Sequence, residues 1–289
     1  MQSNISKKKQ SNYIVVFLET VFSRFTSHFS LRPKAAVDVS KSKAAFTLAE
    51  VLITLGIIGV VAAMTMPALV VNYQKKSLAT QTQKFYSMMS QAVKQYMADE
   101  GVDDLRNTPL ASDNYEDTTS PEAIASMRDF VTKYLKVAEE CDHEANNCFA
   151  EKYRAWNGGE ALDNFTTATN YDEYRDYGLT DGSVIRIGYY YGSESVPISL
   201  YVDVNGKKGP NRVGYDLWNM DIFYDGVIDE SNVGPECRGK DNGKYVPKGL
   251  CQGDRSPDKR RESLFESCKD GIYGGCFGHL LNNNFKFDY

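Results

Sequence analysis

The chain has 289 residues, of which 42% are hydrophobic and 25% charged, a composition that indicates a folded protein and excludes a largely disordered one. Its net charge of −5 is uneven. Residues 1–45 carry eight Lys/Arg and two Asp/Glu and so have a charge of +6, whereas the remaining 25 basic and 36 acidic residues give −11. An acidic body of this kind argues against non-specific nucleic-acid binding, so we predict no nucleic-acid partner for it.

Residues 51–71 form the first predicted element, an apolar run without a single charge. As a helix it is about 32 Å long, which matches the hydrocarbon core of a bilayer, about 30 Å thick. The basic residues before it place residues 1–45 in the cytosol and the body across the membrane. Two alternatives remain open: a buried core helix, and a secretory signal that is cleaved after Ala63.

Glu50 lies at the start of this run, where a carboxylate is costly and normally has a partner. No Lys or Arg lies between it and Lys75, so its own helix offers no cation. A counter-ion then comes from another chain, or from the new α-amino group that a cut before Phe46 would release. In an assembly of parallel helices, Glu50 of one subunit would pair with the Phe46 amine of a neighbour.

The segment Lys43-Ala44-Ala45 and Phe46-Thr47-Leu48-Ala49-Glu50, followed by Gly56, Gly59 and Pro67, resembles the type IV prepilin family. This family includes type IV pilins and type II secretion pseudopilins. The resemblance implies a prepilin peptidase that cuts between Ala45 and Phe46 and methylates the Phe46 amine. It also implies assembly through Glu50 and a helix bend at Pro67, since proline lacks an N–H group. Most members have Gly before the cut, where this chain has Ala45.

The same resemblance implies three regions and a location. Residues 1–45 are a cytosolic basic leader that is removed, residues 46–71 are the transmembrane and filament-core helix, and residues 72–289 are an exported globular domain. The protein is expected in the inner membrane as a single-pass protein with a cytosolic N-terminus before processing. Its body is then periplasmic or extracellular, and its partners are the peptidase and other pilin or pseudopilin subunits in a filament.

Beyond the apolar run, spacings of three, four and seven between apolar residues predict that the helix continues in amphipathic form to residues 99–101. Ser120-Pro121-Glu122 predicts the start of a second helix that ends near Glu139. Residues 150–177 are polar and predict a long connection. A further short helix follows Ser256-Pro257.

The apolar period changes to two after Asp181-Gly182, a turn signal. Residues 183–191, 196–204 and 217–224 predict an antiparallel sheet of about three strands, and Phe285–Tyr289 an edge strand. A long helix followed by a sheet is the α+β layout of a pilin. We therefore expect a pilin-like α+β fold in which the helix packs on a small antiparallel sheet, with a loop-rich C-terminal region stapled by disulfides.

All six cysteines follow the apolar run, and their even number on the exported side predicts disulfides. Fifteen pairings are possible, and we expect the local ones. They are Cys141–Cys148, Cys237–Cys251 and Cys268–Cys276. The alternative is a zinc site, because His143 lies between Cys141 and Cys148, although no fourth ligand is evident.

Residues 203–216 supply many oxygen ligands, and Asp203, Asn205 and Asp216 are candidate calcium ligands. Some type II pseudopilins hold calcium in a loop of their C-terminal region. The EF-hand spacing is absent here and two lysines intervene, so the competing interpretation is a hairpin loop with an Asn-Gly turn. Apart from this calcium candidate, we expect no cofactor.

Catalysis is not expected. His143 and His279 are the only histidines after residue 46, and neither lies in a nucleophile or phosphate-loop motif. The sequence therefore predicts a structural subunit of a type IV pilus or type II secretion pseudopilus. The alternative is a membrane-anchored or secreted binding protein rich in disulfides.

Overall fold

The computed structural model describes residues 47–111, 117–141, 148–159, 174–189, 198–238, 256–270 and 274–289. The expected leader (1–45), Ala45, Phe46, His143 and Cys251 lie outside the described residues. The chain divides into two units, residues 1–59 and 60–289. The described part of the first unit is the start of helix α2 (Leu48–Glu100), whose first half lies in an apolar window with a mean hydropathy of 2.2.

Helix α2 changes character along its length. Its first half is exposed, whereas from Leu78 onward one face is buried in the hydrophobic core of the body. Phe85, Met89 and Val93 lie at the centre of that face and are almost completely inaccessible. Pro67 lies inside α2, and the helix continues through it to Glu100. The amphipathic continuation that the sequence predicts is confirmed.

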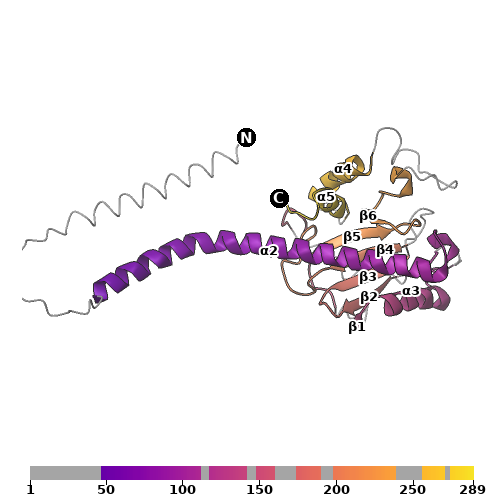
Figure 1. Cartoon of the computed structure of the whole chain (residues 1–289), viewed down its shortest axis with the longest axis horizontal. Helices are drawn as coiled ribbons and strands as arrows, with labels where there is room; N and C mark the ends of the chain where they lie inside the picture. The colour runs from indigo at the N-terminus through magenta and orange to yellow at the C-terminus, as the bar shows by residue number, and fades with distance from the viewer. Residues whose placement is uncertain are drawn as a thin grey trace, which may run out of the picture. The chain divides into compact units, whose positions relative to one another are not determined.

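The body contains a six-stranded sheet in which every strand pairs with the next in antiparallel orientation, in the order β1-β2-β3-β4-β5-β6 (Figure 1). The strands are β1 (Val137–Cys141), β2 (Tyr174–Leu179), β3 (Val184–Tyr189), β4 (Ile198–Asp203), β5 (Leu217–Ile222) and β6 (Ile228–Asp229). The predicted α+β fold is confirmed, but the prediction of about three strands is too low.

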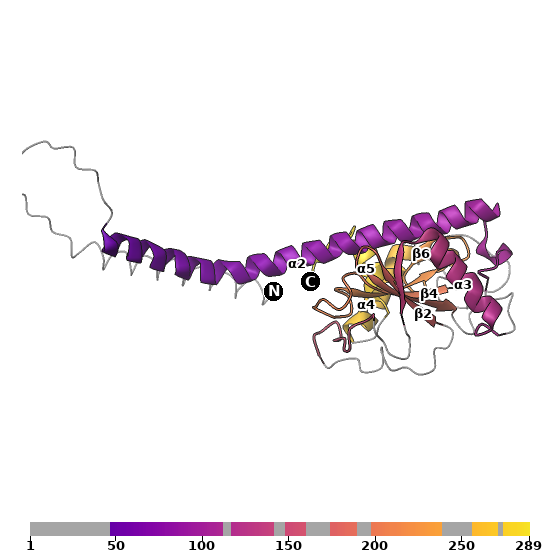
Figure 2. The same cartoon turned by 90° about the horizontal axis from the view of Figure 1, so that it is seen from below.

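Helices cover one face of this sheet (Figure 2). The apolar sides of the central strands meet at paired positions, among them Ile185 with Val202 and Val202 with Trp218. They pack in one core with α2, α3 (Pro121–Tyr134) and α5 (Cys276–Asn282). The opposite face is more polar: there Arg186 pairs with Asp176 at 2.7 Å, both fully buried.

Two helix starts are confirmed. The hydroxyl of Ser120 accepts a hydrogen bond from the Ala123 N–H at the start of α3. The hydroxyl of Ser256 accepts one from the Lys259 N–H at the start of α4 (Pro257–Lys269). Helix α3 ends at Tyr134 rather than near Glu139, because residues 137–141 pair with β2 instead. Two short 3-10 turns, Leu105–Asn107 and Pro235–Arg238, complete the described elements.

The prediction of an edge strand at Phe285–Tyr289 is wrong. These residues form no ladder, and their rings enter an aromatic cluster instead. Phe287 stacks on Trp218 with centroids 6.0 Å apart, and Tyr289 meets Trp156 edge-on at 5.3 Å. Aromatic packing, which requires no fixed period along the chain, therefore holds the last residues on the body.

Candidate functional site

The first turn of α2 is closed by a hydrogen-bonded pair. The Glu50 carboxylate accepts hydrogen bonds from the Thr47 N–H at 2.9 Å and from the Thr47 hydroxyl at 2.8 Å. The Thr47 hydroxyl in turn accepts one from the Glu50 N–H at 3.3 Å. This is a capping box, and its Thr-x-x-Glu signature was present in the sequence. Glu50 thus has a local hydrogen-bond partner that reasoning about counter-ions missed.

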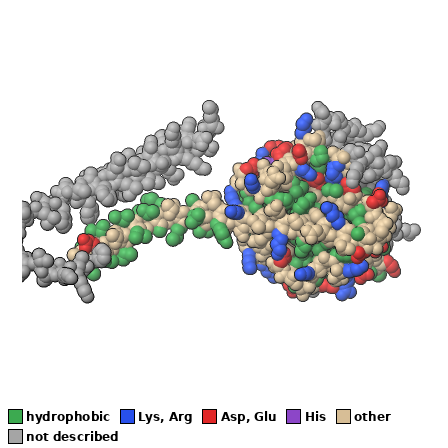
Figure 3. Space-filling model, in the orientation of Figure 1, with side chains coloured by type: hydrophobic (Ala, Val, Ile, Leu, Met, Phe, Trp, Pro, Cys, Tyr) green, Lys and Arg blue, Asp and Glu red, His purple; other side chains and the backbone are tan. Residues whose placement is uncertain are grey.

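The first half of α2 presents an apolar surface without cover from the described residues. Leu52, Leu55 and Ile58 are 61%, 60% and 63% exposed, and the same holds on every side of the helix through Val71. Figure 3 shows this stretch as a rod of green side chains. A surface of this size and composition requires a lipid bilayer or neighbouring helices around it. It excludes the alternative of a buried core helix for this stretch.

Two of the expected disulfides are present. Cys141 bonds to Cys148, and Cys268 bonds to Cys276, with Cα atoms 5.8 and 5.2 Å apart. Cys237 is also disulfide-bonded, while Cys251, its expected partner, lies outside the described residues. The Cys141–Cys148 bond removes both thiolates that the zinc alternative needed, so this alternative is wrong.

The β4–β5 loop brings the three calcium candidates into one region. Asp203 and Asp216 are completely buried and lie close enough for the charge of Asp216 to raise the pKa of Asp203. Burial is the larger cause of that shift, and it also raises the pKa of Asp216, to about 6. The Asn205 N–H donates to Asp203 Oδ1 at 3.1 Å, so the loop folds back over the first carboxylate.

The polar partners of this region leave oxygens unused. Asp203 Oδ2 accepts from the Tyr153 hydroxyl at 2.5 Å, and Asp216 accepts from the N–H groups of Asn211 and Arg212 at 2.7 and 2.6 Å. The side-chain Oδ1 atoms of Asn205 and Asn211 are buried and accept no hydrogen bond from the described residues. Two buried carboxylates and two amide oxygens are of the donor type that a hard cation such as calcium prefers. The described residues contain no group of three or more His, Cys, Asp or Glu side chains that could hold a metal ion, so any site here also needs the amide oxygens.

His279 is surrounded by an aromatic ring and two carboxylates of the body. His279 stacks on Phe265 at 3.7 Å, with one ring nitrogen 2.9 Å from Glu262 and the other 2.9 Å from Asp288. No described serine, threonine or cysteine is hydrogen-bonded to it, so it lacks the neighbour that a nucleophilic site requires. The ring joins α4, α5 and the C-terminal residues.

Comparison with known proteins yields two family matches. Residues 68–157 match a family of unknown function (DUF6613), and residues 40–66 match the prokaryotic N-terminal methylation motif. Neither the curated proteins nor the solved structures contain a match to the chain. The second match spans the predicted cleavage position, Glu50 and most of the apolar run. The chain therefore carries a prepilin-type N-terminal segment, the kind found in type IV pilins and pseudopilins.

Proposed function

We propose that the chain is a structural subunit of a type IV pilus or type II secretion pseudopilus. In this proposal the peptidase cuts between Ala45 and Phe46 and methylates the Phe46 amine. Residues 46–71 then leave the lipid and pack with the helices of neighbouring subunits, while residues 72–289 form the exported body. The single observation that carries the proposal is a methylation motif continuous with an exposed apolar half-helix.

Glu50 acts in assembly in this proposal. Its carboxylate caps its own helix through Thr47, and after cleavage it can also accept from the free amine of a neighbour's Phe46. A buried charge pair of this kind sets the register between packed helices. Pro67 allows the helix to bend, because it removes one backbone hydrogen bond at that position.

The experiment compares the wild type with Glu50→Ala in cells that build the filament. N-terminal sequencing and mass measurement should find both proteins starting at a methylated Phe46. Filament preparations should contain at least tenfold less of the variant, since its helix lacks the registering charge. The control is Glu100→Ala, which removes an exposed acid from the other end of α2.

Two results would contradict this function, and a third would contradict only the role of Glu50. A mature chain starting at Met64 would indicate secretion, and an uncut chain would indicate a membrane-anchored binding protein. Equal filament incorporation of wild type and Glu50→Ala would remove the pairing role of Glu50 while leaving the processing intact.

We also propose that Asp203, Asn205, Asn211 and Asp216 hold a calcium ion. The unpaired buried oxygens of the two asparagines support this proposal, since buried polar atoms are rarely left without a partner. A bound cation would offset the repulsion between the two carboxylates. It would thereby hold the β4–β5 loop in one conformation.

The calcium proposal predicts a ligand-dependent stability. In the purified full chain, calcium added after chelation should raise the thermal midpoint followed by far-UV circular dichroism. At a concentration one hundred times the dissociation constant, the gain is about 2.7 kcal/mol. Asp203→Asn and Asp216→Asn should lose this response, whereas Asp221→Asn, which alters a buried acid outside the loop, should keep it. A wild-type midpoint unchanged by calcium would disprove the site.

A further inference from the structure

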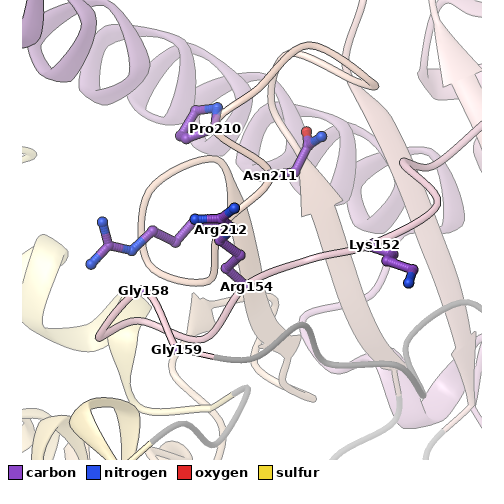
Figure 4. Close-up of a pocket in the computed structure, with 7 residues that line it drawn as sticks. All are labelled: Lys152, Arg154, Gly158, Gly159, Pro210, Asn211 and Arg212. Carbon is purple, nitrogen blue, oxygen red and sulfur yellow. The ribbon is translucent and has the colours of Figure 1, made fainter.

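A basic pocket lies between the β4–β5 loop and the segment 148–159. It has a volume of about 580 Å³, and its charged lining residues are Lys152, Arg154 and Arg212. Figure 4 shows that the lining comes from two neighbouring chain segments, which are joined by backbone hydrogen bonds between Arg154 and residues 211 and 213. None of the described residues that line this pocket is acidic, although the body as a whole is.

The cations of the pocket are not neutralised by the part of the chain that the structure describes. Lys152 and Arg154 are exposed, and neither forms an ion pair with a described Asp or Glu. The Arg212 side chain donates to the Trp156 carbonyl oxygen and lies over the Tyr215 ring at 4.1 Å. Its backbone N–H donates to Asp216, but its guanidinium forms no ion pair with a described acid. Three cations without a described ionic partner around one cavity favour an anionic ligand.

The position of the pocket along α2 identifies the source of that anion. The Tyr215 ring that carries Arg212 also faces Lys75 Nζ, at 6.0 Å. Lys75 and Lys76 are the first charges after Glu50, and Lys75 follows the last apolar residue, Val71, by about 6 Å of helix. The headgroup layer of a bilayer extends roughly 5–8 Å beyond the hydrocarbon. Arg212 therefore lies beside the part of α2 that emerges among lipid headgroups.

Other cations occur at this same end of the body. Lys207 and Lys208 are exposed in the β4–β5 loop, next to the pocket. Figure 3 also shows blue side chains where the apolar stretch of α2 meets the body. The body, residues 72–289, has 25 basic and 35 acidic residues and thus a net charge of −10, so these cations form a basic region on an acidic domain. Such a basic surface attracts anionic lipids.

We propose that this basic pocket binds the phosphate group of an anionic phospholipid in the bilayer that α2 spans. Arg154 and Lys152 contact the phosphate, and Arg212, fixed by Trp156 and Tyr215, forms the rigid side of the site. The bound lipid holds the body against the membrane. The proposal rests on the membrane anchoring of α2, and it needs neither cleavage at Phe46 nor a filament.

The test uses the purified full chain in a neutral detergent and native mass spectrometry. Phosphatidylglycerol and phosphatidylcholine are added in turn, and the bound lipids are counted. We expect the wild type to retain phosphatidylglycerol over phosphatidylcholine, and Lys152→Gln/Arg154→Gln to retain at least fivefold less of it. The matched control is Lys94→Gln/Lys136→Gln, which removes two exposed cations that do not line the pocket and should bind as the wild type does.

Further arms distinguish the possible sources of the anion. Glycerol 3-phosphate and inorganic phosphate should displace phosphatidylglycerol only at much higher concentration, because they lack the acyl chains. Displacement at equal concentration would assign the pocket to a free anion and overturn the lipid proposal. Equal retention by the two double variants, or no preference of the wild type for phosphatidylglycerol, would also overturn it.

Two controls distinguish a loss of lipid binding from misfolding of the variants and from a failure of the proposed cleavage. Circular dichroism of both double variants must show the wild-type spectrum, and Arg154→Gln alone provides a milder variant that should lose part of the binding. N-terminal sequencing of the same preparations reports on cleavage. Loss of lipid binding with normal cleavage, or the reverse, therefore shows which of the two proposals fails.

Discussion

Glu50 illustrates how one side chain can serve two successive environments. The carboxylate is exposed at the first turn of α2, and Thr47 supplies both of its hydrogen bonds. Capping boxes stabilise a helix start by satisfying N–H groups that have no partner inside the helix. A cut before Phe46 leaves Thr47 in place and adds an amine beside it. The cap therefore survives the cleavage that we propose.

Asp221 and Glu230 are buried in the body and form no ion pair with a described Lys, Arg or His. Asp221 lies on the polar face of the sheet, and its Oδ1 has no hydrogen-bond partner. Burial raises its pKa to about 7, despite hydrogen bonds from Ser231 and Ser199 that lower it. Burial also raises the pKa of Glu230 to about 7, although the N–H groups of Gly275 and Gly278 donate to that carboxylate. The folded body thus retains protons that the unfolded chain loses near pH 4.

This retention predicts a pH dependence for Asp221. Between about pH 4 and pH 7 the folded state binds a proton that the unfolded state has released, so the free energy of unfolding falls as pH rises through this window. The loss is at most about 1.4 kcal/mol per pH unit for one group. Asp221→Asn imitates the protonated form. In chemical denaturation it should be more stable than the wild type at pH 8 and should depend less on pH.

A parallel pH profile for Asp221→Asn and the wild type would show that Asp221 does not titrate in this window. The charge of Asp221 also contributes to the raised pKa of Glu230, so the comparison measures the effect of Asp221 together with its effect on Glu230.

At the scale of elements, the turn between β5 and β6 packs closely against α2 at Gly226. Gly226 lies in the turn between β5 and β6 with a φ of +71°, and a Cβ there would lie 2.4 Å from Met97 Sδ and 3.5 Å from Val93 Cγ1. Gly101 has a similar φ of +69°, but nothing lies within 4 Å of its Cβ position. The two glycines therefore separate backbone strain from packing.

Gly226→Ala should lower the free energy of unfolding by more than Gly101→Ala does. Both substitutions place a Cβ in the left-handed region, which costs roughly 1–2 kcal/mol. Only the first also displaces Met97, and overpacking of this kind adds about 1–3 kcal/mol. Chemical denaturation of the full chain measures both values. Equal costs would mean that Met97 moves aside freely and that this contact does not hold α2 on the sheet.

The strands show where sequence patterns were sufficient and where they were not. Strands β3, β4 and β5 were predictable, because their apolar residues alternate and one side faces the helices. The sequence predicted a connection where strand β2 lies, because Asp176 and Gly178 are unusual in a buried strand. Asp176 is tolerated there only because Arg186, ten residues away, pairs with it inside the body. The sequence predicted the end of a helix where strand β1 lies. This strand is at the edge of the sheet and has three exposed residues, so it lacks the apolar pattern of a buried strand.

The same limit applies to the candidate site. Asp203, Asn205 and Asp216 could be chosen from sequence because they cluster in one loop with turn residues. The Tyr153 hydroxyl on Asp203 and the unpaired oxygen of Asn211 depend on tertiary packing, which local patterns do not encode. The basic pocket likewise requires two segments that are about 55 residues apart in the chain, so no short motif indicates it.

For the whole molecule, charge follows the path of the chain through the membrane that we propose. The first 45 residues are basic, the next 26 contain one carboxylate, two lysines follow, and the body is acidic. This order favours one orientation, since positive residues remain on the cytosolic side. The lysines at the other end of the span are near the basic pocket, where they face the opposite surface of the same bilayer.

The aromatic cluster of the last residues has a practical consequence for optical measurements. The chain contains two tryptophans, and both belong to this cluster: Trp156 contacts Tyr289, and Trp218 contacts Phe287. Their fluorescence therefore responds to the packing of the C-terminal residues as well as to the core around Trp218. A shift in emission on insertion or assembly would signal release of this tail, even while the rest of the fold remains intact.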